Sequence, residues 1–337
     1  MKKILVVFAA ICIMSMGACF SPWDGSGDQG TIVIDLGDSG ARAAADGDGY
    51  TAILTGSGGA AMSQTITGGK ASFSVQPGLW NVAVRRANSA GRLNGYGEKS
   101  NVEVKAGATA SASIDLRNLI EVGGEWNNLK EAIEGGQAEL VMLTSETLTV
   151  NDSIEIPHGK SITLLAETKV TIIKGNNFPN SMFRVPRGSS LTLGVAGGMG
   201  GTITFDGDGK GNSSLIYVGT TRLNNSSDNT GDGGKLTMYD GVILTNNIAN
   251  VSTNDRGGAV VVQGGTFNMY GGEISRNKNT ANGGGVRVLS GTLTKTGGTI
   301  YGSDGGENSN TAVSGHAVYF DSSNKAIDTT LGPKNNL

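Results

Sequence analysis

The sequence predicts an all-β protein: a small N-terminal antiparallel β-sandwich over residues 31–117, then a right-handed parallel β-helix over residues 118–337 with an N-terminal capping helix. Three observations predict this class. Short segments alternate apolar and polar residues. Gly is the commonest residue, at 55 of 337, and aromatic residues make up only 5% of the chain. A stretch in the second half repeats with a fixed offset, which is typical of solenoids.

Residues 1–18 have the pattern of a secretory signal peptide. A basic start, Met1-Lys2-Lys3, precedes thirteen uncharged residues, too few to span a bilayer, and then the small pair Gly17-Ala18. The segment Met16-Gly17-Ala18-Cys19 resembles the lipobox of bacterial lipoproteins, although that family prefers Leu where this chain has Met16. The resemblance implies that Cys19 carries diacylglycerol and acyl chains such as palmitate. The alternative is an ordinary signal peptide with a chance Cys.

Composition excludes several other classes. The formal net charge is −3, and it becomes −5 when Lys2 and Lys3 leave with the signal peptide. No basic run suits nucleic acid, so no nucleic-acid partner is expected. Cys12 is discarded with the signal peptide, so no disulfide framework forms. No second apolar stretch approaches eighteen residues, and lipid on Cys19 should be the one membrane contact.

Residues 19–30 predict a flexible tether, and the sandwich follows. Six short alternating segments separated by Gly, Asn or Asp predict six or seven strands: Thr31–Leu36, Tyr50–Thr55, Lys70–Val75, Trp80–Arg85, Asn101–Val104 and Ser111–Leu116. The segments Gln76–Val84 and Val104–Gly107, with a Pro-Gly turn leading into a long strand, resemble the regulatory-like, prealbumin-type sandwiches that are accessory domains of secreted proteins.

One helix is predicted, from Trp126 to Gly135. Trp126, Leu129 and Ile133 share one helical face with Ala132, and Gly135-Gly136 would end the helix. Trp126 could stack on a carbohydrate, but we favour a buried face that covers the open edge of the first coil.

The repeat is clearest where residues 257–274 match residues 283–300 at an offset of 26. Lys235–Ile243 is an earlier copy. By strand parity the apolar residues of each copy point to a core: Leu236, Met238, Phe267, Met269 and Leu293. Lys295 occupies the slot of Met238 and Met269. We therefore expect Lys295 to point inward near the open C-terminal end of the rod, and the alternative is a register shift that leaves it on the surface.

The phrase Gly-Gly-Ala-Val…Gly-Gly-Thr-Phe-Asn-Met-Tyr-Gly-Gly-Glu-Ile-Ser-Arg-Asn…Gly-Gly-Gly-Val resembles bacterial surface lipoproteins with right-handed β-helix repeats. These share their coil pattern with polymorphic outer-membrane adhesins and pectate lyases. The resemblance covers about residues 119–320. It implies a fold and leaves the function open, because related folds carry many functions.

Catalytic signals are sparse, and we predict no catalytic residue, metal site or cofactor. Asp206 and Asp208 form the best local acidic pair, but no Glu follows at the spacing of a calcium loop, so we interpret them as a plain turn. Asp240 aligns with glycines and is interpreted as a corner with positive φ. His158 and His316 lack partners at metal-ligand spacing and are interpreted as loop or edge residues.

Asn-rich corners allow two interpretations. Stacked amides could bind a glycan, or Asn could serve structurally by adopting left-handed conformations and forming ladders with itself. We favour structure for these residues: Asn246, Asn247, Asn277, Asn279, Asn308 and Asn310.

Two functions are consistent with these features. The first is a lipid-anchored protein of the cell envelope, in the outer membrane or at the cell surface, that presents an adhesin-like, non-catalytic surface to a glycan or to a host or envelope protein. The alternative is a polysaccharide lyase or glycoside hydrolase with its site in the loop Thr220–Gly234 or on the adjacent coil face. Convergence of three or more carboxylates in a groove would favour the enzyme.

Overall fold

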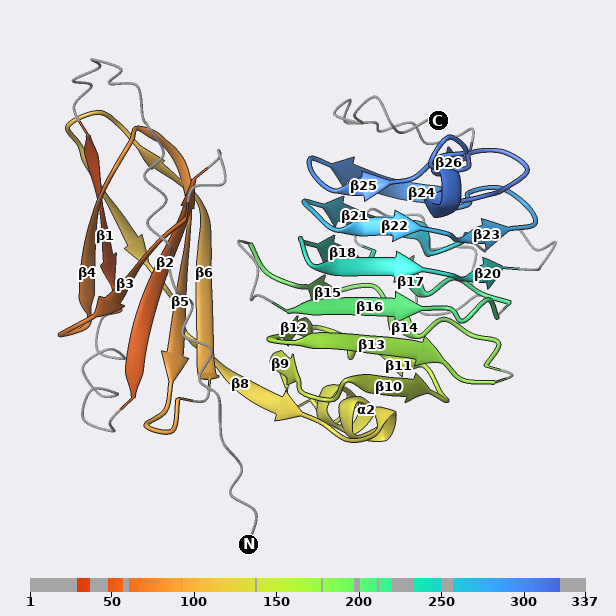
Figure 1. Ribbon diagram of the computed structural model, residues 1–337, viewed down its shortest axis with the longest axis horizontal. Helices are drawn as coiled ribbons and strands as arrows, with labels where there is room; N and C mark the ends of the chain where they lie inside the picture. The colour runs from red at the N-terminus through yellow and green to blue at the C-terminus, as the bar shows by residue number, and fades with distance from the viewer. Residues whose placement is uncertain are drawn as a thin grey trace, which may run out of the picture.

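The computed structural model describes residues 29–36, 48–56, 61–91, 93–136, 138–176, 178–196, 201–210, 212–219, 233–249 and 257–321. Cys19, the signal peptide and residues 220–232 lie outside them. The described residues form an all-β protein with a single α-helix (Figure 1). Strand β8 (Arg117–Val122) joins an N-terminal block, residues 29–116, to a repeat block, residues 123–321.

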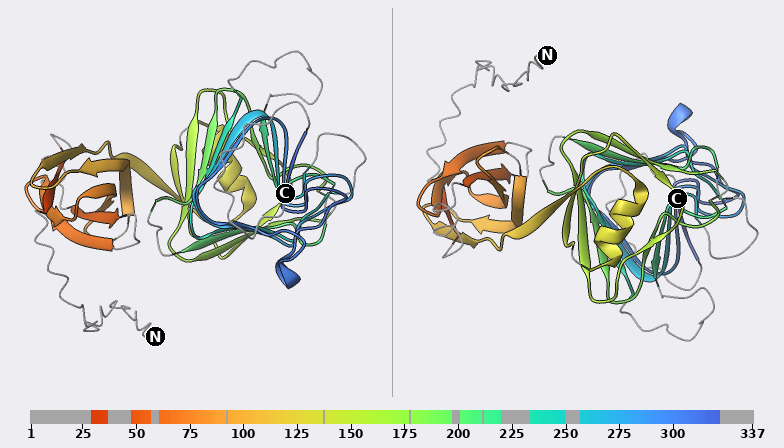
Figure 2. Two further views of the ribbon diagram at one scale, coloured as in Figure 1. Left: turned by 90° about the horizontal axis from the view of Figure 1, so that it is seen from above. Right: turned by 90° about the horizontal axis from the view of Figure 1, so that it is seen from below.

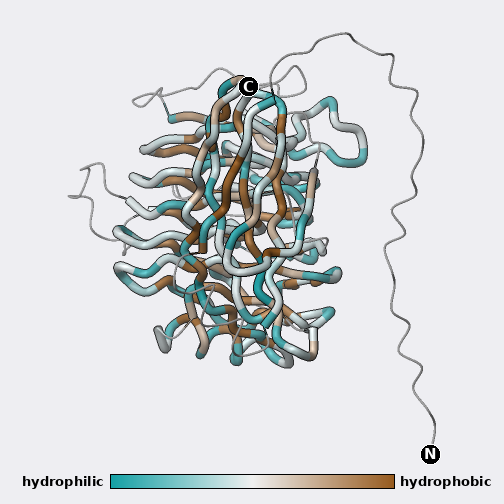
Figure 3. Tube along the Cα trace, turned by 90° about the vertical axis from the view of Figure 1, so that its left-hand side faces the viewer, coloured by the Kyte–Doolittle hydropathy of each residue, from teal (hydrophilic) through white to brown (hydrophobic). Residues whose placement is uncertain are grey.

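The N-terminal block has two sheets around one apolar core. One sheet has the order β4-β1-β7 and the other continues as β6-β5-β2-β3. Alternate residues of each strand point into the shared core, as Ile32, Phe73 and Val84 illustrate. Figure 3 shows this alternation of apolar and polar residues along the strands. The strands are β1 (Gly30–Asp35), β2 (Gly49–Gly56), β3 (Ala61–Ile66), β4 (Lys70–Val75), β5 (Gly78–Ala87), β6 (Leu93–Val104) and β7 (Thr109–Ser113).

The expectation of a purely antiparallel arrangement is wrong for one pair, because β1 and β7 run parallel. Strand β7 follows β6, which belongs to the other sheet, and the chain crosses between the sheets before β7 begins. After that crossing β7 enters beside β1 in the same direction, and the N–H of Thr31 donates to the carbonyl of Ala108 at 2.8 Å. Alternation in the sequence predicts a strand but carries no information about its direction.

The strands of the repeat block stack into three columns of parallel strands (Figure 1). Column 1 contains β8, β9 (Leu140–Leu143), β12 (Ser161–Ala166), β15 (Ser190–Leu193), β18 (Lys235–Met238) and the second halves of β21 (Val260–Met269) and β24 (Val286–Lys295). Column 2 contains β10 (Thr147–Val150), β13 (Lys169–Lys174), β16 (Thr202–Asp206), β19 (Val242–Thr245), β22 (Glu273–Ser275) and β25 (Thr299–Ile300). Column 3 contains β11 (Ile154–Glu155), β14 (Phe183–Val185), β17 (Ile216–Gly219), the first halves of β21 and β24, and β26 (Val318–Phe320).

Along the chain, strands visit columns 1, 2 and 3 in turn, and each pass forms one layer. The short strands β20 (Ile248–Ala249) and β23 (Lys278–Asn279) pair with each other, and the 3-10 helix η1 (Gly306–Asn308) follows β25. Phe267 pairs with Leu293 and Met269 with Lys295, so the offset predicted from the sequence is confirmed. The inward residues of all three columns form one continuous apolar core.

The predicted helix is confirmed as α2 (Trp126–Glu134), with Trp126, Leu129 and Ile133 buried and Ala132 half-buried. It contacts β8, β10 and β11 and lies across the end of the stack, as Figure 2 shows from above and below. The helix therefore covers the apolar interior at the first layer. Trp126 is only 1% exposed, so its ring face is not offered to a carbohydrate.

The interpretation of Asp240 as a positive-φ corner is wrong. The left-handed conformation belongs to the next residue of each copy: Gly241, Gly272 and Gly298. Glycine occupies the aligned position 271 for a different reason, because a Cβ there would lie 2.2 Å from Oδ1 of Asp240 in the layer below. That Oδ1 accepts the N–H of Gly272 at 3.2 Å.

Candidate functional site: a cleft between the two blocks

The two blocks meet through an apolar interface. Ala83 and Tyr96 of the N-terminal block pack with Leu140, Met142 and Leu165, which point outward from column 1. Strand β8 belongs to both sides, since it pairs with β6 at Gly95–Tyr96 and with β9 over its last four residues. The interface therefore fixes one face of the N-terminal sheet against the stacked layers.

Polar groups, one buried and one half-buried, accompany this apolar contact. The hydroxyl of Tyr96 donates to Oε2 of Glu98 at 3.0 Å, and Glu98 also accepts the backbone N–H of Ala196 from the repeat block. Burial raises the pKa of Glu98, while Tyr96 and Arg117 partly offset this shift. Burial, together with the nearby Glu98 carboxylate, raises the pKa of Tyr96 well above its ordinary value. Glu98 is thus a direct polar link between the blocks.

Beside this link the blocks leave a cleft of about 430 Å³. The N-terminal block contributes residues of β2, β5 and β6, and the repeat block contributes the corner that follows column 1 in four successive layers. The residues that line the cleft are Thr55, Gly56, Asn81, Ser100, Asn101, Ala196, Tyr239, Asp240, Tyr270 and Thr296.

Two tyrosines form the repeat-block wall of the cleft. Met238 pairs with Met269, and Met269 with Lys295, so the residues that follow them lie one above another: Tyr239, Tyr270 and Thr296. The rings of Tyr239 and Tyr270 are stacked, with centroids 5.3 Å apart and an interplanar angle of 27°. Burial and the negative charge of Glu98 raise the pKa of Tyr239 to about 12, so this phenol stays protonated and uncharged at neutral pH.

Amides and hydroxyls form the opposite wall. Asn101 has a left-handed backbone, with φ of 58°, and its N–H donates to Oδ1 of Asn81 at 3.2 Å. This bond orients the Asn81 side chain, whose Nδ2 group supplies donors. Among the described residues that line the cleft, Asp240 is the one charged group.

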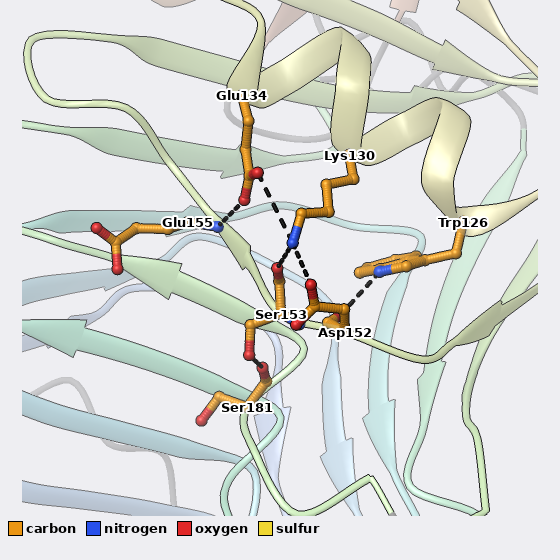
Figure 4. A network of polar contacts seen from close by, with 7 residues as sticks. All are labelled: Trp126, Lys130, Glu134, Asp152, Ser153, Glu155 and Ser181. Atoms are coloured by element: carbon orange, nitrogen blue, oxygen red, sulfur yellow. Dashed lines mark hydrogen bonds and ion pairs between the residues drawn. The ribbon is translucent and has the colours of Figure 1, made fainter.

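A second groove, of about 530 Å³, lies beside α2 and is lined in part by Lys130, Glu131, Glu134 and Asp152. Figure 4 shows that Lys130 contacts Glu134 of the same helix and also reaches Asp152, while the indole N–H of Trp126 donates to the carbonyl of Asp152 at 2.8 Å. Hydrogen bonding to Asp152 raises the pKa of Lys130, and the same bond lowers the pKa of Asp152. Three carboxylates line this groove, but Glu134 and Asp152 both pair with Lys130, and Glu134 also accepts the N–H of Glu155 at 3.0 Å. These two side chains therefore hold the helix on the first layers and are not a free catalytic pair.

The weak metal candidates Asp206 and Asp208 lie where β16 ends: Asp206 is its last residue and Asp208 is in the corner that follows. Asp206 accepts the N–H of Asp208 at 2.7 Å and the side chain of Asn246 at 3.2 Å, and Asp208 pairs with Lys210. Both carboxylates are therefore bonded within this corner or to the corner of the next layer. No group of three or more His, Cys, Asp or Glu residues in the described part of the chain is arranged to hold a metal ion.

The Asn-rich corners form a buried ladder, as the structural interpretation expected. Oδ1 of Asn277 accepts the N–H of Asn247 at 3.1 Å, and Oδ1 of Asn310 accepts the N–H of Asn277 at 2.8 Å. Sequence reasoning missed the residue below, Lys174, which is only 1% exposed and donates to Oδ1 of Asn247 at 3.0 Å. The sequence did contain a signal for Lys174: in the same strand it alternates with Val170 and Ile172, so it lies on their inward face.

The histidines lie apart from the cleft. Nδ1 of exposed His158 lies 2.9 Å from the carbonyl of Arg187, and Nδ1 of half-buried His316 accepts the N–H of Ala312 at 3.2 Å. Within the described ranges no helix is long and apolar enough to cross a membrane. No family model, curated protein or solved structure matches the chain.

Proposed function

We propose that this protein is a lipid-anchored component of the bacterial cell envelope, in the outer membrane or at the cell surface, that binds an envelope or host molecule without catalysis. In this proposal the stacked layers are a right-handed parallel β-helix, and the two N-terminal sheets are a β-sandwich of the regulatory-like type. Residues 1–18 are removed as a signal peptide and Cys19 carries the lipid. The cleft between the sandwich and the β-helix is the binding site.

The observation that carries the proposal is the composition of the cleft. Two stacked tyrosines face amides and hydroxyls, which is the mixture of apolar surface and few oriented polar groups that binding sites use. Glycoside hydrolysis ordinarily needs two carboxyl groups across the scissile bond. Asp240 is the one carboxylate among the described cleft residues, and its Oδ1 already accepts the N–H of Gly272.

Anchoring is tested with Cys19→Ser in the full-length chain. The unmodified protein should partition into detergent, and the variant should be released into the soluble fraction, because two or more acyl chains hold a protein stably at a membrane. A variant that still enters the detergent phase would place the anchor elsewhere.

Binding is tested with a soluble chain that begins at Phe20. This chain should cosediment with cell envelopes of the producing bacterium or with host matrix, and Tyr270→Ala should weaken cosedimentation. The matched control is Tyr301→Ala, a half-buried tyrosine away from the cleft. Cleavage products released from a polysaccharide panel by the unmodified chain would overturn the non-catalytic proposal in favour of a lyase or hydrolase.

A further inference from the structure

The exposed ring of Tyr270 offers one face to the cleft. Its other face is occupied by Tyr239 in the layer below, at 5.3 Å. In the layer above, the same register position holds Thr296, which is small and exposed. Tyr270 remains 44% exposed as a result, a high value for an aromatic residue beside an apolar interface. A flat apolar face of this kind suits a ligand with a flat apolar face of its own.

The opposite wall is suited to hydroxyl groups. Thr55, Ser100, Asn81 and Asn101 offer hydroxyl and amide groups, each of which can both donate and accept a hydrogen bond. A pyranose ring has the matching chemistry, because its axial C–H groups form an apolar face and its hydroxyls lie around the rim, where each donates and accepts. Stacking on Tyr270 would direct that rim toward the amides of the N-terminal block.

Charge selects among glycans. No Lys or Arg is found among the described residues that line the cleft, while Asp240 lies in it and Glu98 lies behind Tyr239. An acidic sugar would lose hydration and meet like charge without a cation to pair with. A neutral sugar meets neither cost.

A peptide fits less well. Extended peptides are commonly recognised by pairing with the exposed edge of a sheet. Among the described strands that line the cleft, β2 and β5 each have a neighbour on both sides. The open edge is the part of β6 beyond Tyr96, where the left-handed backbone of Asn101 interrupts the extended strand that a peptide would pair with.

We propose that the cleft binds a neutral glycan, with a pyranose ring stacked on Tyr270 and its hydroxyls bonded to Asn81 and Asn101. This inference rests on the proposed function, because it names the ligand class of the same site. Tyr270 and Asn101 then determine affinity, and Asp240 determines selectivity against acidic sugars.

The test uses the soluble chain from Phe20 with two panels of defined oligosaccharides: neutral ones built from hexose or N-acetylhexosamine, and acidic ones built from hexuronate. Saturation-transfer NMR and calorimetry measure binding. A neutral oligosaccharide should bind, and Tyr270→Ala should raise its Kd about tenfold or more, equivalent to about 1.4 kcal/mol. Tyr270→Phe should keep the affinity within about threefold, because the ring is retained.

Two further variants sharpen the test. Asn101→Gly keeps the left-handed backbone and removes the amide, so it should weaken neutral binding without unfolding the protein. Asp240→Asn should admit acidic oligosaccharides, because it removes the repelling charge. Tyr301→Ala should change neither the binding of neutral oligosaccharides nor the exclusion of acidic ones.

Each contrary outcome has a distinct meaning. Acidic binding that depends on Tyr270 in the unmodified chain would overturn the ligand class and keep the site. Neutral binding that survives Tyr270→Ala would overturn the site. If neither panel binds while envelope or matrix cosedimentation still depends on Tyr270, the ligand belongs to neither glycan class and only this inference fails. Cosedimentation that does not depend on Tyr270 would overturn the proposed function itself.

Discussion

Asn277 is the side chain on which the polar ladder of the repeat block most depends. It is buried between Asn247 and Asn310 in successive layers. Its Oδ1 accepts the N–H of Asn247 at 3.1 Å, and its Nδ2 donates to the carbonyl of Leu244 at 3.0 Å and to Oδ1 of Asn310 at 3.0 Å. Asn277→Ala removes all of these bonds at once.

The cost follows from what is left unsatisfied. The N–H of Asn247 would be buried without its acceptor, which costs about 1–3 kcal/mol. Each lost neutral hydrogen bond contributes a further ~0.5–1.5 kcal/mol. Oδ1 of Asn310 still accepts the backbone N–H of Asn277 in the variant, so that bond is not lost. We therefore expect Asn277→Ala to lower the free energy of unfolding by about 3–5 kcal/mol. For a unit of this size that corresponds to a fall in Tm of roughly 6–20 °C.

Thermal and urea unfolding of the soluble chain, followed by circular dichroism, measure the effect. The control is Asn308→Ala, which removes a half-buried Asn in the same region whose Oδ1 accepts Nε of Arg276 at 3.1 Å. That variant should lose less than about 1 kcal/mol. Equal losses for the two variants, or a loss below about 1 kcal/mol for Asn277→Ala, would refute the argument that the ladder stabilises the stack.

Three further predictions follow. Trp126→Ala should lower the free energy of unfolding, measured by guanidinium titration, by about 3–5 kcal/mol, because the buried ring packs edge-on against Phe183 with centroids 5.4 Å apart. A change near zero would show that α2 does not stabilise the end of the stack. The raised pKa of Glu98 means that the folded state binds its proton more tightly, so wild-type stability falls as pH rises from the ordinary glutamate value to the raised one. Glu98→Gln should therefore gain relative to wild type across that window, and a difference independent of pH would contradict this. A chain beginning at Arg117 should fold but self-associate in sedimentation, because Leu140 and Met142 lose the residues that cover them. A chain beginning at Glu121 also loses two of the residue pairs between β8 and β9, so it should be less stable. Equal melting temperatures for the two chains would count against a structural role for β8.

The sequence was sufficient for the features that depend on local pattern. Periodicity placed α2 within a residue of its observed end, and parity placed Leu236, Phe267 and Leu293 in the core. These predictions succeed because the geometry of a strand or helix alone determines on which face each side chain lies. The alignment of repeats also placed Tyr239 and Tyr270 in one register, although their pairing as one wall of a cleft did not follow.

What the sequence left out depends on contacts between distant segments. The direction of β7, the double role of β8 and the position of the N-terminal sheet are set by tertiary packing. One signal of the interface was present: Leu140–Leu143 is apolar at every position, which is typical of a strand covered on both faces. The partner that covers the outer face comes from residues 53–96, and no local pattern identifies it.

Lys295 gives a test of the repeat core at its C-terminal end. The expected inward position is confirmed: the side chain is 5% exposed and lies above Met269, whereas Thr294 is half-buried and Thr296 exposed. Strand β26 pairs only with the first half of β24, so among the described strands this part of β24 is the last of column 1. Burial lowers the pKa of Lys295, which means that the folded state disfavours its charge.

Lys295→Met should therefore stabilise the protein at neutral pH by about 1 kcal/mol, because it extends the apolar stripe of the two earlier layers and removes a desolvated charge. The lowered pKa also fixes how the stability difference between Lys295→Met and wild type changes with pH. The unfolded chain holds the proton up to its ordinary pKa, so the wild-type penalty is complete below the folded pKa and vanishes as pH rises toward 10.5. The advantage of the variant should shrink over the same window. Lys278→Met, at an exposed lysine, should stay within about 0.5 kcal/mol of wild type at every pH. A lower melting temperature for Lys295→Met would mean that contacts of the amine outweigh its desolvation, and the charge would then be a built feature of the open end of the stack.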